Sequence, residues 1–136
     1  MSRGLRNRNP GNIRRSAVRY LGEVRPSRDA EFKQFETMAY GYRAMFVLLD
    51  SYARRHGLHT LRTMIGRYAP PSENDTRGYV EAVSRLSGID ADRRLDTRAH
   101  DEMAAVVAAM SRVENGTAAV AEEVEQGWRL YVGEGE

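Results

Sequence analysis

Glu114 stands where a carboxylic acid could do chemistry, because Asn115 and Gly116 follow it directly after a run of small and apolar residues. An Asn-Gly pair is a common helix stop, so the run predicts a helix that holds this carboxylate in its last turn. The negative end of the helix dipole and partial burial both favour the protonated form of a carboxylic acid. Such an acid can donate its proton to the leaving oxygen of a glycosidic bond. The alternative is a solvent-facing residue beside a helix stop.

The apolar neighbours that would partly bury Glu114 are expected to be Met110, Val113 and Trp128. Glycoside cleavage also requires a second carboxylate, or the acetamido group of the substrate, to stabilise the cation or activate water. Glu23 is the next catalytic candidate, since it lies among arginines where an ion pair would lower its pKa. A lowered pKa suits a base or an electrostatic stabiliser, and the alternative for Glu23 is a surface ion pair.

Several polar and aromatic side chains could bind a sugar. Asn9, Asn12 and Arg14 carry groups that can hydrogen-bond the N-acetyl and hydroxyl groups of a glycan. Both asparagines could instead lock the Pro-Gly turn that lies between them. Tyr20 and Tyr68 could line a groove for the apolar faces of sugar rings, whereas tyrosines at helical spacing are otherwise core residues.

The segment SENDT (72–76) follows two prolines, which make it a stiff polar loop, and we expect it at the edge of a groove. Glu73 and Asp75 are its candidates for substrate binding. The alternative for Asp75 is a helix cap, because its side chain can accept a hydrogen bond from a free backbone N–H.

The composition argues against several other kinds of site. The chain has no cysteine, and His56, His59 and His100 have no metal-ligand spacing, so we expect no metal. No phosphate-binding loop or dinucleotide fingerprint occurs, so we expect no cofactor. The net charge is +2, and arginines crowd the first part of the chain, which could favour an anionic partner. Nothing there resembles a helix-turn-helix, so we do not expect sequence-specific nucleic-acid binding.

The elements that must position these residues are mainly helices. Apolar residues recur at helical spacing in five segments, 38–56, 61–69, 77–87, 99–113 and 117–132. Thr60 is expected to cap the second segment, and Asp75 or Thr76 the third. Asp96 or Thr97 is expected to cap the fourth. Glycines or prolines follow the first three segments and end them.

Residues 1–36 carry turn chemistry instead, in the segments RNPGN, LGE and RPSRD. We expect an irregular arm with a small two- or three-stranded sheet, whose strands lie around 12–18 and 31–35. The 136 residues suit a single domain, with this β/turn arm followed by a helical body over 37–132. The predicted fold class is mainly α (α+β), a single helical domain with a small N-terminal β hairpin.

Segments spread over nearly the whole chain resemble a family of phage and prophage proteins, which are labelled structural or virion proteins and sometimes lysozyme-like. The matching segments are NPGNIR (9–14), YLG (20–22), GYRA (41–44) and YAPPSENDT (68–76), together with Phe32 and Phe35. The combination of NPGNIR with PPSENDT is the most specific part of this pattern. The resemblance implies a phage or prophage protein.

A second resemblance connects NPGNIR, FKQFETMAYGYRAMFVLL and RYA to bacterial glucosaminidase domains with the lysozyme-like fold. In those domains the catalytic glutamate ends a helix that precedes the hairpin, whereas here only MSRGLRNR precedes it. The helix that ends in Glu114 follows the hairpin, which would fit a circularly permuted lysozyme-like arrangement. The resemblance then implies that Glu114 is the acid of a muramidase or glucosaminidase.

Two classes of function follow from the sequence. The first is a phage-derived, peptidoglycan-directed glycosidase, and the alternative is a non-catalytic virion or accessory protein that binds wall glycan or another phage protein. The expected partners are therefore glycan strands or other phage proteins, in an oligomeric state that the sequence leaves open. No apolar run approaches the roughly 18 residues that cross a membrane. We expect no signal peptide, and a location in the bacterial cytoplasm before lysis or assembly, or in the virion.

Overall fold

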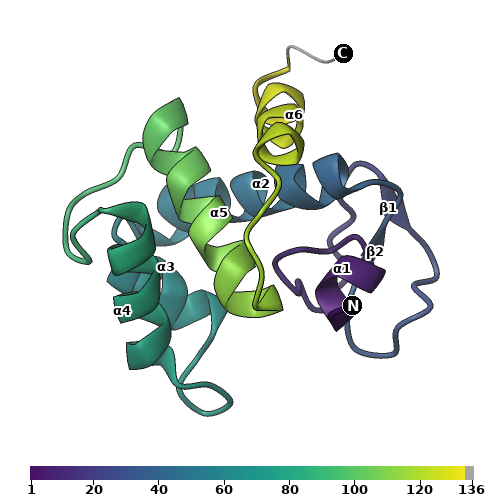
Figure 1. The fold of residues 1–136 in the computed structure, drawn as a ribbon, viewed down its shortest axis with the longest axis horizontal. Helices are drawn as coiled ribbons and strands as arrows, with labels where there is room; N and C mark the ends of the chain where they lie inside the picture. Colours follow the sequence, from purple (N-terminus) through teal and green to yellow (C-terminus); the bar gives the residue numbers. More distant parts are fainter. Residues whose placement is uncertain (134–136) are drawn as a thin grey trace.

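Helix α2 (Met38–His56) runs through the middle of the molecule, and the other helices are arranged around it (Figure 1). The structure is a computed structural model that describes residues 1–133. One face of α2 is buried against its neighbours because apolar side chains recur there at helical spacing. The largest of them are Tyr42, Met45, Phe46 and Leu49.

The boundaries of α2, α3 (Leu61–Tyr68) and α4 (Thr76–Ser87) follow from residues that the sequence identifies as stops and caps. Gly57 ends α2 in the left-handed conformation, with φ of 65°. Thr60 and Asp75 cap α3 and α4, because each side chain accepts a hydrogen bond from a backbone N–H in the first turn. These predictions are confirmed.

Helix α5 (His100–Asn115) begins without the predicted cap. Ala99 is at the N-cap position, and no side chain there accepts a hydrogen bond, so the prediction of Asp96 or Thr97 is wrong. Both side chains are used elsewhere. The Thr97 hydroxyl donates to the carboxylate of Asp50 on α2 at 2.7 Å, and Asp96 accepts from a neighbouring backbone amide.

The last helix, α6 (Ala121–Val132), begins later than predicted, so the expected start at Thr117 is wrong. Val120 is at the N-cap in an extended conformation. The chain needs this extended link because it must return from the end of α5 to α2, where α6 packs (Figure 1). Gly127 allows the close approach, since a side chain there would collide with Tyr42.

Helix α1 (Arg3–Arg6) was not predicted. Ser2 caps it by accepting a hydrogen bond from the Leu5 amide, and the Ser2 hydroxyl also donates to Asn115 Oδ1 at 2.7 Å. A helix of four residues is too short to show periodicity in the sequence, and its support is the tertiary contact with the end of α5.

The small β element is a two-stranded antiparallel hairpin of β1 (Glu23–Val24) and β2 (Gln34–Phe35). The strand predicted around 31–35 is confirmed in its last residues. The strand predicted around 12–18 is wrong, because only Arg14 forms an isolated bridge there and the rest of that segment is a mostly exposed loop.

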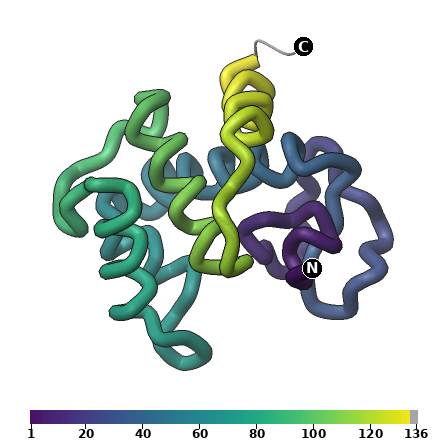
Figure 2. Tube along the Cα trace, in the orientation of Figure 1, coloured from purple at the N-terminus to yellow at the C-terminus, as the bar shows by residue number. Residues whose placement is uncertain are grey.

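Figure 2 shows the N-terminal segment folded at one side of the molecule and the α3–α4 pair at the other, with α2 and α5 between them. The described residues are mainly helical with one small hairpin near the N-terminus, as predicted. The C-terminal end of α5 reaches the N-terminal segment. Residues 134–136, which the predicted domain includes, lie outside the described residues.

Candidate functional site

A pocket of about 430 Å³ lies between the N-terminal segment and the end of α3 with the loop that follows it, at the C-terminal end of α5. We call it the Glu114 pocket. It brings together candidates that are widely separated in the sequence, and six of the nine predicted site residues line it. These six are Asn12, Arg14, Tyr20, Tyr68, Glu73 and Glu114.

Two neutral donors hold the Glu114 carboxylate. Asn12 Nδ2 donates to Oε1 at 2.9 Å, and the Tyr79 hydroxyl donates to Oε2 at 2.8 Å. Burial, together with the nearby Tyr68 and Glu114, raises the pKa of Tyr79 well above its usual value, so Tyr79 remains a neutral donor. No cation of residues 1–133 pairs with Glu114. The carboxylate is therefore fixed in orientation while its charge is left uncompensated.

Tyr79 was missed as a site residue because it is one of the regularly spaced apolar residues of α4, a pattern that indicates the core. The side chain is indeed buried, at 8% exposure, and only its hydroxyl reaches the pocket residue. No local signal in the sequence distinguishes a tyrosine that points its hydroxyl at a distant carboxylate from one that merely packs.

The Pro-Gly turn is docked directly on the end of α5, which brings Asn12 to the carboxylate. Asn115 Nδ2 donates to the carbonyl of Pro10 at 2.8 Å, and the Tyr68 hydroxyl donates to the carbonyl of Gly11. A side chain at Gly11 would collide with that hydroxyl. Asn12 itself adopts a left-handed conformation, with φ of 48°, which asparagine tolerates better than most residues.

Asn9 is fully buried and does not line the Glu114 pocket. Its amide nitrogen donates to the carbonyls of Ile13 and Lys33 at 3.0 and 2.9 Å, and its amide oxygen accepts from the Ile13 amide at 3.0 Å. These bonds lock the turn, which is the alternative that the sequence left open for this residue.

An ion pair joins the two sides of the pocket. Arg14 Nη2 lies 3.4 Å from Glu73 Oε2, and the same guanidinium lies 3.6 Å from Glu31 and 5.2 Å from the centre of the Phe32 ring. Both partners of the first pair are more than half exposed. Asp75 caps α4 and does not line the pocket, so Glu73 is the residue of the SENDT loop that the structure brings to it.

Glu23 is placed in a different environment from Glu114. It is buried at 8% exposure, and its carboxylate accepts hydrogen bonds from Lys33 at 3.1 and 3.2 Å, from Arg25 at 2.9 Å and from the Tyr20 amide at 3.1 Å. Burial alone would raise the pKa of Glu23, but these hydrogen bonds outweigh it and lower the pKa below its usual value. The predicted direction is confirmed, with Lys33 as an unexpected partner.

Glu23 and Glu114 do not share a pocket. Glu23 lines two other hollows, of about 380 and 490 Å³, neither of which includes Glu114. The two predicted catalytic carboxylates therefore do not face a common position in which a glycosidic bond could be bound.

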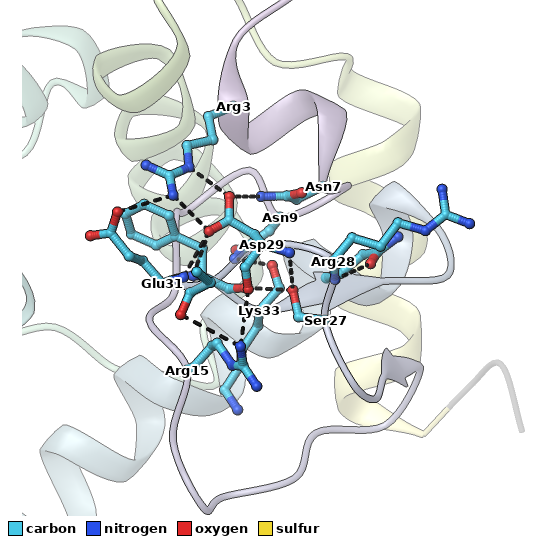
Figure 3. A network of polar contacts seen from close by, with 12 residues as sticks. Arg3, Asn7, Asn9, Arg15, Ser27, Arg28, Asp29, Glu31 and Lys33 are labelled. Carbon is cyan, nitrogen blue, oxygen red and sulfur yellow. Dashed lines mark hydrogen bonds and ion pairs between the residues drawn. The ribbon is translucent and has the colours of Figure 1, made fainter.

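The arginines of the N-terminal segment are largely occupied within it. Figure 3 shows Asp29 at the centre of a polar network, where Arg3 donates to both of its oxygens at 2.6 and 2.7 Å and Asn7 donates at 3.0 Å. The Arg3 hydrogen bonds hold the pKa of Asp29 well below its usual range. Part of the positive charge that the sequence concentrates here is thus compensated by the segment's own carboxylates.

Trp128 is not the neighbour of Glu114 that the sequence predicts. Its ring packs edge-on against Phe46 on α2 and against His100, with ring centres 5.2 and 5.3 Å apart. His100 begins α5 and Glu114 is in its last turn, so the two are about 20 Å apart at a rise of roughly 1.5 Å per residue. The prediction is wrong because Trp128 packs at the opposite end of α5.

Within residues 1–133, no group of three or more His, Cys, Asp or Glu side chains is arranged to hold a metal ion. None of the helices in this range is both long enough and apolar enough to cross a membrane.

Comparison with known proteins identifies a phage relative. No model of a known protein family matches the chain. Protein P5 of Pseudoalteromonas phage PM2 is 35% identical to it, in an alignment that covers 96% of this chain and 83% of the relative. Identity at this level over nearly the whole chain places it in a family of phage proteins, as the sequence predicts. The chain belongs to the family of protein P5.

Proposed function

We propose that this phage-type protein binds the glycan strand of peptidoglycan in the Glu114 pocket and cleaves a glycosidic bond there, with Glu114 as the general acid. One observation carries the proposal. A carboxylate at a helix end is oriented by two neutral donors, faces a pocket between two parts of the fold, and is paired with no cation of the described residues. A structural carboxylate would more commonly be neutralised by a cation.

In the proposed reaction the Glu114 carboxylic acid gives its proton to the glycosidic oxygen as the bond to the anomeric carbon breaks. A water molecule adds to the resulting cation, and its proton passes to the second carboxylate of the pocket, Glu73. Tyr79 and Asn12 keep Glu114 in place. We give Glu23 no part in this reaction, because its carboxylate is buried against Lys33 and lines other hollows than the one that holds Glu114.

The order of the elements supports the proposed relation to lysozyme-like enzymes. The hairpin precedes α2, and the helix that carries the acid comes later in the chain, which is the order expected of a permuted arrangement. The support is the order of elements together with the position of Glu114 in the last turn of α5.

The test is digestion of purified peptidoglycan, with the released fragments identified by mass spectrometry. The wild type is compared with Glu114→Gln, and with Glu81→Gln as a matched control on the exposed face of α4. Circular dichroism verifies the fold of each variant. We expect fragments from the wild type and from Glu81→Gln but not from Glu114→Gln, and the end groups of the fragments identify the bond. A wild type that releases nothing contradicts the catalytic part of the proposal.

A second candidate is a virion or accessory protein that uses the same pocket only to bind, either wall glycan or another phage protein. It is favoured by the comparison, because the relative is a phage protein whose name, protein P5, states no activity. This candidate predicts that the wild type cosediments with peptidoglycan sacculi, or with phage particles, without releasing fragments.

A further inference from the structure

Arg67 lines the Glu114 pocket but has no acidic partner. It lies in the last turn of α3 and is exposed, and no carboxylate of residues 1–133 pairs with it. The other arginine of the pocket, Arg14, already contacts Glu73 and Glu31. Among the described residues that line the pocket, Arg67 is therefore the cation left to meet an anion from outside.

The guanidinium of Arg67 lies over an aromatic ring. Its central carbon lies 5.4 Å from the centre of the Tyr52 ring, within the range of a cation–π contact. Burial raises the pKa of Tyr52 to about 12, despite the opposing charge of Arg67, so this ring stays neutral. A guanidinium that is already oriented on an aromatic face loses less side-chain freedom when it binds an anion.

Apolar and aromatic side chains surround this cation. Val18, Tyr20, Leu48 and Tyr52 line the pocket together with Arg67. A partly apolar wall that carries one guanidinium without a carboxylate partner among residues 1–133 fits a sugar with one anionic substituent better than it fits a neutral sugar or a highly charged polymer. Carboxylate is the anion whose two oxygens match the guanidinium fork.

Resting on the proposed function, we propose that Arg67 binds a carboxylate carried by the glycan and makes the Glu114 pocket selective for anionic glycan over neutral glycan. The negative charge of Glu73 repels such a group, so Arg67 also directs it to the tyrosine-lined part of the pocket. Peptidoglycan offers carboxylates of two sources, the lactyl group of its sugars and its stem peptides. Arg67 recognises the chemistry that the two sources share.

The experiment measures binding by isothermal titration calorimetry in the Glu114→Gln background, so that cleavage does not interfere. The probes are neutral chitohexaose, glycan strands stripped of peptide, and the same stripped strands with their carboxylates converted to methylamides. Arg67→Gln is compared with Arg85→Gln, which removes an exposed, unpaired arginine from the last turn of α4, outside the pocket. Arg67→Lys keeps the positive charge but removes the planar guanidinium, so it separates the contribution of the charge to binding from that of the guanidinium geometry.

We expect Arg67→Gln to weaken binding of the stripped strands about tenfold, as for a lost charge-assisted hydrogen bond, and to leave binding of chitohexaose unchanged. Arg85→Gln should change neither, and Arg67→Lys should fall between Arg67→Gln and the parent. The methylamide strands should bind the Glu114→Gln parent weakly. Their affinity should match that of unmodified stripped strands for the Arg67→Gln variant of this parent. Soluble strands that retain their peptides identify the source, since an Arg67 effect on these alone assigns the carboxylate to the peptide.

Two results would overturn the inference and leave the proposed function standing. One is an equal loss of affinity for neutral and anionic glycan on changing Arg67, and the other is an anionic preference that survives in Arg67→Gln. If neither the wild type, tested by cosedimentation with sacculi, nor the Glu114→Gln parent binds any of the glycans, the proposed function fails and this selectivity fails with it. Circular dichroism and the unchanged binding of chitohexaose show that Arg67→Gln is folded.

Discussion

Two glutamates that the sequence offers as catalytic candidates, Glu23 and Glu114, occupy opposite environments in the molecule. Glu23 is buried and receives hydrogen bonds from two cations, Lys33 and Arg25. Glu114 is only partly buried, and an amide and a phenol hold it without supplying any positive charge. The first charge is neutralised inside the protein, whereas the second is presented to a pocket.

The difference separates a carboxylate that is paired with cations inside the fold from the one to which we assign the proposed chemistry. A buried carboxylate requires compensation, and removal of one partner leaves an unpaired charge. A carboxylate held by neutral donors keeps its orientation and can still gain or lose a proton. The compensation of charge, rather than the residue type, is what distinguishes the two sites.

Exchange of each glutamate for glutamine should give opposite results, and this is the largest effect we expect. Glu114→Gln should lower the rate of glycan cleavage by about 10²- to 10⁴-fold, the usual contribution of a general acid. Its stability should change by less than about 1 kcal/mol, because the new amide can accept from Asn12 and donate to Tyr79. Glu23→Gln should lower the free energy of unfolding by about 3 kcal/mol and preserve cleavage by the folded protein.

The measurements are fragment release at a temperature where both variants are folded and urea unfolding followed by circular dichroism. If Glu23→Gln abolished cleavage while the protein stayed folded, the separation between the two sites would be wrong.

Lys33→Met should destabilise the protein by about 3 kcal/mol, since among residues 1–133 it leaves the buried Glu23 with Arg25 as its only charged partner. Removal of both charges in the double variant Glu23→Gln/Lys33→Met should cost less than the sum of the single changes, by about 2 kcal/mol. A double-mutant cycle from urea unfolding measures this coupling. Strict additivity would show that the pair does not act as a unit.

Tyr79→Phe should have a smaller effect on both the free energy of unfolding and the rate of glycan cleavage. Loss of the hydroxyl that donates to Glu114 should cost about 1 kcal/mol of stability, and cleavage should fall roughly tenfold because the acid is less well oriented. Tyr131→Phe is the matched control, since its hydroxyl donates to the Thr97 carbonyl, far along α5 from the pocket. Equal losses of cleavage in both variants would argue against a positioning role for Tyr79.

The smallest expected effect is a change in pH dependence. The pKa of Glu23 is lowered from an ordinary value of 4.5, so its stabilising contribution is fully present above about pH 4.5. As the pH falls further, the unfolded chain takes up this proton before the folded chain does, and the contribution is lost. The free energy of unfolding should therefore decline less steeply below about pH 4.5 in Glu23→Gln. Identical slopes in the two proteins would contradict the lowered pKa.

The sequence predicted those parts of the fold that depend on local rules. Gly57, Thr60 and Asp75 act on backbone within a turn of themselves, and the helices they bound are where we expected them. The position of Glu114 in the last turn of a helix was predicted for the same reason, since it depends only on the helix stop that follows it.

The missed features depend on contacts between distant parts of the chain. Lys33 is fully buried because it meets Glu23 across the hairpin, and Tyr79 becomes a site residue only because α4 lies against the end of α5. Arg67 shows nothing in the sequence that sets it apart from other arginines. A pattern within one segment cannot report such contacts, because they are set by how the segments pack.

The docking of the Pro-Gly turn on the end of α5 has a consequence for when the Glu114 pocket forms during synthesis. Asn12 and Glu114 are 102 positions apart, and the bond from Asn115 to Pro10 spans 105. A nascent chain therefore carries its turn for most of its synthesis with nothing to dock against. The pocket can form only after α5 has left the ribosome. Under the proposed function, an unfinished chain would thus be unable to cleave glycan, and only a folded chain would present Glu114 to the pocket.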